Sequence, residues 1–296
     1  MLSICIPVYN VQVSQLVNTL HQQGKRLDVP FEILLIDDAS EETFRQSNSA
    51  LGKLQYVRYE ELTQNIGRSR IRNLLAVKAR FPLLLFLDCD AEITTGDFLK
   101  KYLDAGKDGS VVCGGHVYQS EQPSHPFVLH WLAGSQREVV PASARQRKPH
   151  HSFMTGSFLV PSSLLYQLPF NEELSGYGHE DTLYGYQLMK RSIAVKHIDN
   201  PIIHNGLESG IMFLSKIRQS LVNLKKISEL TKYDPEFIDM VRVLKVYHTL
   251  KRYKIDRLFI LFFKPIENTT IKHLTGKHPR LCMLDVYKLG IICQQP

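Results

Sequence analysis

The sequence predicts an α/β protein with a mainly parallel sheet flanked by helices, followed by a helical C-terminal extension. Three observations lead to this prediction. Short apolar runs alternate with helical patterns through the first half of the chain, which is typical of βαβ units. Two of the runs, 31–36 and 82–87, are typical of buried strands, as expected in a sheet covered by helices. From residue 211 onward the apolar spacing becomes helical.

The spacing of apolar residues also predicts the individual elements in order. Leu16, Val17 and Leu20 share one face of the first expected helix, and the second apolar strand stops at Asp37-Asp38. The expected strands are 2–8, 31–36, 54–59, 82–87, 111–118 and 194–198, and the expected helices of this half are 13–21, 66–79 and 180–191.

The segment 119–151 has few periodic signals and several prolines and arginines, so we expect an irregular loop or lid there. Further along, Leu214, Ile217 and Leu221 begin the apolar face of a long helix. Asp234-Pro235 resembles a helix cap followed by a first-turn proline, which predicts a second helix over 235–253. We therefore expect a catalytic domain at 1–210 and a basic helical extension at 211–296.

Composition narrows the class of protein. The chain has 296 residues, 44% of them hydrophobic, which is ordinary for a globular protein. Five cysteines without CxxC spacing are expected to be reduced thiols in a cytoplasmic protein. Met1 leads almost directly into a strand, so no cleavable signal is expected. The longest apolar runs are far short of the ~20 residues that span a bilayer.

Charge is distributed unevenly along the chain. Residues 1–210 carry a net charge of −2, whereas 211–296 carry 16 basic and 7 acidic residues, a net charge of +9. A lysine-coated helical tail without a partner is one interpretation. Attraction to an anionic membrane surface is the other, since each nearby cation contributes ~1 kcal/mol. No nucleic-acid-binding module surrounds these charges, so no nucleic acid partner is expected.

Polar signatures follow three of the expected strands. They are Pro7-Val8-Tyr9-Asn10, Asp37-Asp38-Ala39-Ser40 and Asp88-Cys89-Asp90. Ligands of open α/β sheets bind outside the carboxyl ends of the strands, where all three signatures should meet. Loop acids commonly cap helices or close turns, but three signatures at one edge favour a binding site.

Asp88 and Asp90 are candidate ligands for a divalent cation. Two carboxylates one residue apart repel each other, and a hard cation relieves this repulsion and neutralises a diphosphate. His204 follows an expected strand and can return to the same site, where imidazole beside carboxylates suits Mn²⁺. Most histidines are structural, and an isolated Asp-x-Asp occurs by chance in many proteins.

Glu180 and Asp181 begin a helix after Gly176-Tyr177-Gly178-His179. Acids in the first turn of a helix are favoured by its dipole, so capping alone explains much of their placement. The glycine pair suggests close approach of a ligand to the backbone. A carboxylate held there can act as a general base toward a hydroxyl.

Three arginines at positions 68, 70 and 72 follow Asn65-Ile66-Gly67 on the expected helix 66–79. Their alternate spacing places them around the helix, so they cannot all face one ligand. We expect one to contact a phosphate or ribose, and the others to be surface charges or partners of Glu60 and Glu61.

Together these segments resemble glycosyltransferase family 2 enzymes of the GT-A, Rossmann-like fold, over roughly residues 2–206. The resemblance rests on the order and spacing of five motifs: 3–10, 32–40, 65–67, 88–90 and 178–181. It implies inverting transfer from an activated, usually UDP-linked sugar with Mn²⁺ or Mg²⁺. Two positions depart from the family pattern, because Ala39 stands where glycine is common and His179 where a small residue is common.

The resemblance also implies roles for individual residues. Asp181 matches the general base, with Glu180 beside it orienting the acceptor. The metal ligands would be Asp90, Asp88 and His204, with Asp88 also facing the ribose or donor sugar. The nucleoside would be framed by Pro7, Tyr9 and Asp38, with Asn65 near the nucleotide.

The predicted function is therefore metal-assisted transfer of a hexosyl or N-acetylhexosaminyl group from a UDP-sugar to a glycan or lipid-linked glycan, as in assembly of surface polysaccharides. The protein is expected in the cytoplasm, peripheral to the inner face of the cell membrane. Two alternatives stay open: a non-catalytic nucleotide- or carbohydrate-binding protein on this scaffold, and a sugar nucleotidyltransferase. The latter normally has a glycine-rich phosphate loop near its first strand, and neither GxGxxG nor a Walker A motif is present.

Overall fold

The computed structural model describes residues 1–174 and 176–295. It divides into two compact units. Unit 1 comprises 1–119, 139–174 and 180–206, and unit 2 comprises 120–138, 175–179 and 207–296. The expected boundary at residue 210 lies close to the last crossing between the units, but two earlier segments of the chain also belong to unit 2.

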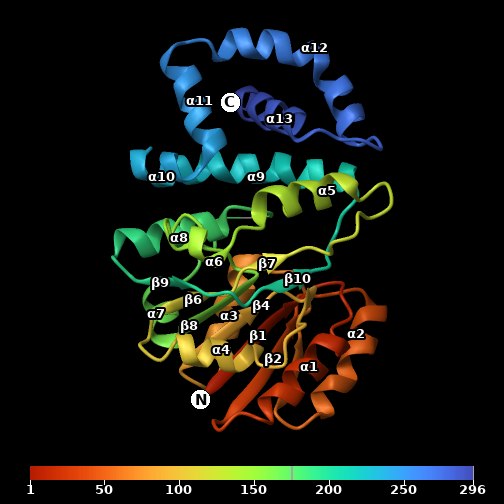
Figure 1. Ribbon diagram of the computed structural model, residues 1–296, viewed down its shortest axis with the longest axis vertical. Coiled ribbons are helices and arrows are strands. Elements are labelled where there is room, and N and C mark those ends of the chain that lie inside the picture. The colour runs from red at the N-terminus through yellow and green to blue at the C-terminus, as the bar shows by residue number, and fades with distance from the viewer. Residues whose placement is uncertain (175, 296) are drawn as a thin grey trace. The chain divides into compact units, whose positions relative to one another are not determined.

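Unit 1 is built around a mainly parallel sheet, as the sequence predicts (Figure 1). In the described residues this sheet has the strand order β3-β2-β1-β4-β8-β6-β9, and β3, β2, β1 and β4 are parallel neighbours. Its strands are β1 (Leu2–Val8), β2 (Phe31–Asp37), β3 (Val57–Glu61), β4 (Leu83–Leu87), β6 (Val111–Cys113), β8 (Ser157–Pro161) and β9 (Val195–His197).

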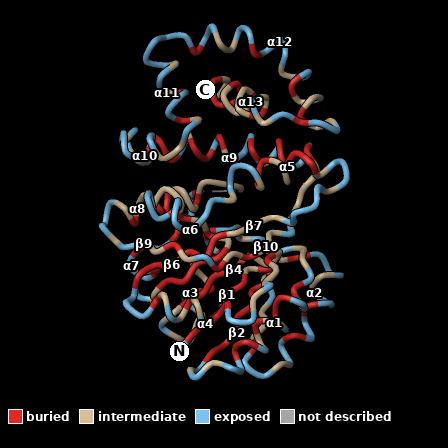
Figure 2. Tube along the Cα trace, viewed as in Figure 1, coloured by how far each residue is buried: buried red, intermediate tan, exposed pale blue. Residues whose placement is uncertain are grey.

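Helices cover both faces of this sheet. Alternate strand residues pack against different helices: Ile4 and Leu85 lie in the core formed with α1 and α4, whereas Cys5 and Phe86 lie in the core formed with α3 and α8. Burial on both faces explains why the strands are apolar along most of their length (Figure 2). The helices of unit 1 are α1 (Ser14–Gly24), α2 (Glu42–Ser49), the 3₁₀ helix η1 (Ala50–Lys53), α3 (Arg68–Lys78), α4 (Phe98–Ala105), α6 (Ala142–Arg145), α7 (Ser162–Gln167) and α8 (Glu180–Lys190).

The expected strand 111–118 is interrupted. It forms β6 and then β7 (His116–Val117), because the chain turns at Gly115, whose φ is 88°. Strand β7 belongs to a small sheet with β5 (Ala91–Glu92) and β10 (Ile202–His204), in the order β5-β10-β7 within the described residues. This small sheet brings the segment after β4 beside the segment after β9.

Unit 2 is helical. Helix α13 lies within an arch formed by α9, α11 and α12, and α5 packs on α9 (Figure 1). The unit's elements are α5 (Val128–Ala133), the π-helical turn η2 (Gly134–Glu138), α9 (Gly210–Leu230), α10 (Pro235–Met240), α11 (Arg242–Arg252), α12 (Asp256–Leu274) and α13 (Leu281–Gln294). Among the described residues, no helix is long and apolar enough to cross a membrane.

Two expectations about helices were wrong. The segment 119–151 is not irregular throughout, because it forms α5, η2 and α6. The expected helix 235–253 is two helices, α10 and α11, separated at Val241, whose φ of −121° and ψ of 109° are those of extended backbone. Val241 therefore ends one helix and precedes the next.

Candidate active site

The loops after β1 and β2 are tied together at the carboxyl edge of the sheet. The N–H of Asn10 donates to Oγ of Ser40 at 2.8 Å, and the N–H of Glu41 donates to Oδ1 of Asn10 at 2.8 Å. Asn10 and Ala39 both have left-handed backbone, with φ of 52° and 61°. Glycine adopts this conformation most easily, so the backbone at position 39 is less favourable for the alanine present than it would be for glycine.

Asp38 anchors the loop that leads into α3. Its carboxylate accepts hydrogen bonds from the N–H groups of Ile66, at 2.7 Å, and Gly67, at 3.1 Å, and its carbonyl accepts one from the Asn65 side chain. Burial raises the pKa of Asp38, although the two backbone hydrogen bonds act in the opposite direction. The structure thus brings Asp38 and Asn65 together. Two other expected nucleoside contacts, Pro7 and Tyr9, lie at the end of β1, and Tyr9 is 51% exposed.

Asp90 and His204 meet through the small sheet. His204 is the register partner of Ala91 in the antiparallel pair β5–β10, so its ring reaches the neighbouring Asp90. Nδ1 of His204 lies 3.3 Å from Oδ2 of Asp90. Burial alone would raise the pKa of Asp90, but the hydrogen bond from His204 and the positive charges of His204 and Arg68 hold it below its usual value.

These two side chains fit a divalent cation. Oδ1 of Asp90 is buried, and no donor among the described residues reaches it. Carboxylate oxygen with imidazole nitrogen is a ligand pair that Mn²⁺ accepts. The described residues contain no group of three or more His, Cys, Asp or Glu side chains placed to hold a metal. Asp90 and His204 would therefore hold the ion together with oxygens of the substrate.

Gly206 makes room for the Asp90 carboxylate. A Cβ atom on Gly206 would lie 1.9 Å from Oδ2 of Asp90 and 3.1 Å from the His204 ring. The N–H of Asn205 donates to the carbonyl of Asp90 at 3.1 Å, which fixes the two loops against each other. Sequence reasoning missed Gly206, although its position two residues after a candidate ligand was a usable signal.

Asp88 is engaged by a buried arginine. Nη2 of Arg72 donates to Oδ1 of Asp88 at 2.9 Å, and Arg72 is only 1% exposed. The same guanidinium lies 3.6 Å from Oε1 of Glu180, and Arg68 lies 3.4 Å from that oxygen. The structure therefore brings Asp88 and Glu180 together through Arg72, whereas Asp90 pairs with His204.

The expectation for the arginines of α3 was partly wrong. Arg68 and Arg72 are four residues apart, so they share one face of the helix and both contact Glu180. Arg70 lies on another face, 3.7 Å from Glu172. Glu60 and Glu61, the expected partners of these arginines, contact other residues. Glu60 pairs with Arg58 and Lys78, and Glu61 lies near Arg45.

Glu180 and Asp181 have opposite electrostatic environments. Burial would raise the pKa of Glu180, but Arg68 and Arg72 lower it below its usual value, so Glu180 is ionised. Burial and the negative charge of Glu180 raise the pKa of Asp181 to about 6, despite hydrogen bonds from the N–H and hydroxyl of Thr182. Neighbouring carboxylates with separated pKa values are typical of acid–base sites.

The glycine pair before these acids packs closely against α9. A Cβ atom on Gly178 would lie 2.5 Å from Cβ of Ser220, and one on Gly176 would lie 1.9 Å from Nε2 of Gln219. The close approach that requires glycine is therefore to α9, within unit 2. His179 has a left-handed φ of 67°, a backbone conformation that is uncommon for residues other than glycine.

Comparison with known sequences decides the family. The sequence profile described as Glycosyl transferase family 2 matches residues 3–168, more than half of the chain. The protein belongs to glycosyl transferase family 2. Asp38, Asn65, Arg72, Asp88 and Asp90 lie within the matched region of this family 2 glycosyltransferase, whereas Glu180, Asp181 and His204 follow it. No curated protein matches the sequence significantly.

Solved structures confirm the GT-A fold. Mannosyl-3-phosphoglycerate synthase from Rubrobacter xylanophilus has a TM-score of 0.57 and 16% identity, over 79% of this chain and 76% of that chain. The mannosyltransferase PcManGT from Pyrobaculum calidifontis, solved in complex with GDP-Man and Mn²⁺, has a TM-score of 0.54 and 14% identity, over 77% of this chain. TarS from S. aureus has a TM-score of 0.50 and 20% identity, over 75% of this chain. The family 2 chain spans 64% of the PcManGT chain and 39% of the TarS chain.

Proposed function

We propose that this protein is an inverting glycosyltransferase that moves a sugar from a nucleoside diphosphate sugar to a hydroxyl of a glycan or lipid-linked glycan. The observation that carries the proposal is the buried bridge from Asp88 through Arg72 to Glu180. This bridge links the carboxyl end of β4, where donors bind in open α/β sheets, to the beginning of α8. Asp181, the proposed base, is the next residue along that helix.

Asp181 is suited to accept a proton. With a pKa of about 6 it is mostly ionised at neutral pH, yet it is more basic than an ordinary aspartate. As the acceptor oxygen bonds to the anomeric carbon, its proton passes to Asp181 and the bond from that carbon to the diphosphate oxygen breaks. One in-line displacement inverts the anomeric centre. We assign about 10²–10⁴-fold of the rate enhancement to the base and most of the rest to positioning.

Asp90 and His204 would hold the divalent cation, Mn²⁺ or Mg²⁺. When bound, the cation would neutralise charge on the diphosphate leaving group. The buried Oδ1 of Asp90 and the space left by Gly206 support this assignment. Arg72 occupies Oδ1 of Asp88, so we assign Asp88 to the ribose or donor sugar in preference to the ion.

For the nucleotide, we propose UDP, bound along Pro7, Tyr9, Asp38 and Asn65 at the ends of β1 and β2. The exposed Tyr9 ring offers a face for a base, and the fixed loop 65–67 closes the edge. GDP is the competing nucleotide, because PcManGT is solved with GDP-Man. Thermal shifts with UDP- and GDP-sugars, each with and without Mn²⁺, will distinguish these donors.

The decisive experiment measures release of the nucleotide from nucleotide sugars by the purified protein and by Asp181→Asn. The wild type should release nucleotide in a metal-dependent way, and the variant should lose about 10²–10⁴-fold of this rate while its nucleotide affinity changes much less. Nucleotide sugar binding without any turnover by the wild type would favour the non-catalytic alternative. Formation of a nucleotide sugar from a nucleoside triphosphate and a sugar phosphate, with release of pyrophosphate, would favour the nucleotidyltransferase.

We also propose that unit 2 attaches the enzyme to an anionic membrane surface. Helix α12 exposes Leu258, Leu261 and Phe262, which are 53%, 68% and 68% exposed, and basic residues flank them at Arg257 and Lys264. An apolar strip with basic neighbours is typical of interfacial helices. Sedimentation with phosphatidylserine vesicles should be salt-sensitive and reduced by Leu261→Ser with Phe262→Ser. If that variant sediments with the vesicles as much as the wild type does, α12 does not take part in the interaction.

A further inference from the structure

Unit 2 contains a cavity of about 630 Å³ that the active-site residues described above do not line. Its walls come from α9, α11, α12 and α13 together with Arg137 and His179. The volume lies within the range of about 300–1,000 Å³ that is typical of small-molecule sites. The cavity therefore has room for a ligand, and the chemistry of its walls indicates which kind.

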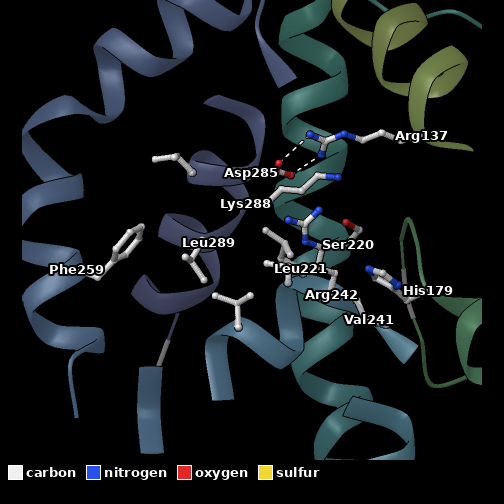
Figure 3. A pocket seen from close by; sticks show the side chains of 13 residues that line it. Arg137, His179, Ser220, Leu221, Val241, Arg242, Phe259, Asp285, Lys288 and Leu289 are labelled. Carbon is white, nitrogen blue, oxygen red and sulfur yellow. Dashed lines mark hydrogen bonds and ion pairs between the residues drawn. The ribbon is translucent and has the colours of Figure 1, made fainter. Parts of the chain in front are cut away.

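One side of the cavity is apolar. Phe259 of α12 and Leu289 of α13 lie on this side in Figure 3. The lining has five more aliphatic residues, of which Leu221 and Val241 lie beside Arg242 in Figure 3: Leu221, Val241, Val243, Val246 and Val286. Such a surface stabilises a hydrocarbon chain by about 25 cal/mol per Å² removed from water.

The other side carries charge. Figure 3 shows Arg137, Lys288 and Arg242 on this side, with Ser220 beside them. Arg137 makes a two-pronged ion pair with Asp285, whose carboxylate also accepts from Nη2 of Arg137 at 2.7 Å. Among the described residues, the lining thus carries two arginines and a lysine against one carboxylate, that of Asp285.

Lys288 and Arg242 are the cations in excess. Burial lowers the pKa of the Lys288 amine, while the carboxylate of Glu138 acts in the opposite direction. An ammonium group in such a place gains from an anionic partner, because the surrounding protein solvates its charge less well than water does. Arg242 begins α11 beside it, and its planar guanidinium is suited to bind phosphate through two hydrogen bonds.

We propose that this cavity binds a single-chain amphiphile, with its phosphate or diphosphate headgroup on Arg242 and Lys288 and its hydrocarbon chain against Phe259 and Leu289. Free phosphate would leave the apolar side unfilled, and an uncharged hydrocarbon would bring no anionic group to Arg242 and Lys288. An amphiphile with an anionic head satisfies both sides. The proposal rests on unit 2 alone and does not depend on the proposed glycosyl transfer.

The test is calorimetric titration of the full-length protein with dodecyl phosphate below its micelle concentration. Inorganic phosphate and dodecanol are titrated alongside to separate the headgroup from the chain. We expect dodecyl phosphate to bind at least about tenfold more tightly than either, because each of these lacks one of the two contact types. Equal affinity of dodecyl phosphate and dodecanol would overturn the headgroup assignment.

Matched variants locate the site. Arg242→Gln combined with Lys288→Gln should weaken dodecyl phosphate binding about tenfold or more, whereas Lys272→Gln, an exposed charge on α12 that does not line the cavity, should not. Val246→Trp should block the chain, whereas Val222→Trp, exposed on α9 outside the lining, should leave binding unchanged. Circular dichroism confirms that each variant is folded. Unchanged binding by both the charge variant and Val246→Trp would refute the proposal.

Discussion

Nη2 of Arg72 lies 2.9 Å from Oδ1 of Asp88, and Nη1 of the same guanidinium lies 3.6 Å from Oε1 of Glu180. One buried cation thus balances two carboxylates that come from different strands and helices of unit 1. Removing the cation would leave both carboxylates without their shared partner in a site that water reaches poorly. Arg72 is therefore expected to position the acids and to support the fold of the site.

The first prediction concerns Arg72. Arg72→Met should lower the free energy of unfolding by about 3–5 kcal/mol, because breaking a buried ion pair leaves uncompensated charge. Adding Glu180→Gln should recover part of this loss, since one of the two carboxylates is then neutral. Urea denaturation followed by fluorescence measures both effects.

Arg70 provides the matched control for this experiment. It lies on the same helix but is exposed, 3.7 Å from Glu172, so Arg70→Met should change stability by no more than about 0.5 kcal/mol. An equally small effect of Arg72→Met would show that the bridge does not stabilise the site.

The second prediction concerns the pH dependence of transfer. Asp181 must be ionised to accept a proton, and its pKa is raised to about 6 by burial and by the charge of Glu180. The value of kcat/KM should therefore fall as pH decreases through about 6. Glu180→Gln removes the neighbouring negative charge and should move this acidic limb of the pH profile of kcat/KM to lower pH. A limb that stays in place in Glu180→Gln would show that another group controls it.

The third prediction separates the charge of Asp181 from its catalytic role. A raised pKa means that the folded state binds the proton more tightly than the unfolded state, so ionised Asp181 destabilises the fold as pH rises from about 4 through 6. Asp181→Asn should therefore stabilise the protein by about 1–3 kcal/mol at pH 7. The gain should largely disappear near pH 4, which thermal denaturation at both pH values will show.

The fourth prediction uses Gly206. A Cβ atom there would lie 1.9 Å from Oδ2 of Asp90, so Gly206→Ala should displace this carboxylate. We expect Mn²⁺-dependent binding of the nucleotide sugar to weaken by at least about tenfold, as for altered metal surroundings in general.

Gly96→Ala is the control for Gly206→Ala, because a Cβ atom on Gly96 would meet nothing within 4 Å. It should leave Mn²⁺-dependent donor binding unchanged. Equal metal dependence in Gly206→Ala and the wild type would argue against Asp90 as a ligand.

Much of the fold could be predicted from the sequence. The strand 2–8 was placed correctly, and β2 and β4 were placed within one residue, because burial on both faces makes such strands nearly continuous apolar runs. Strand β8 was missed, because its apolar run is only Phe158-Leu159-Val160, and it lies between β4 and β6 as an antiparallel strand, outside the βαβ pattern. Periodicity identifies local elements but not their order in a sheet.

The candidate site was predictable in its acids but not in its arginines. Strand ends and helix beginnings mark Asp38, Asp88 and Glu180, since parallel strands direct their carboxyl ends to one edge. The burial of Arg72 depends on carboxylates that are distant in sequence, so no local pattern reports it. The i, i+4 spacing of Arg68 and Arg72 was the available signal, and it indicated a shared face.

Unit 2 is assembled from three separate stretches of the chain, and this has a consequence for protein synthesis. His130 stacks on Phe213, and Arg137 pairs with Asp285, so these contacts of the segment 120–138 are made with residues that leave the ribosome later. Unit 2 therefore cannot complete its folding until α13 has been translated, and the segment 120–138 lacks these contacts until then. For the same reason, a deletion from residue 207 onward would strip α5 of its support, so point substitutions are the sound way to assign functions to this unit.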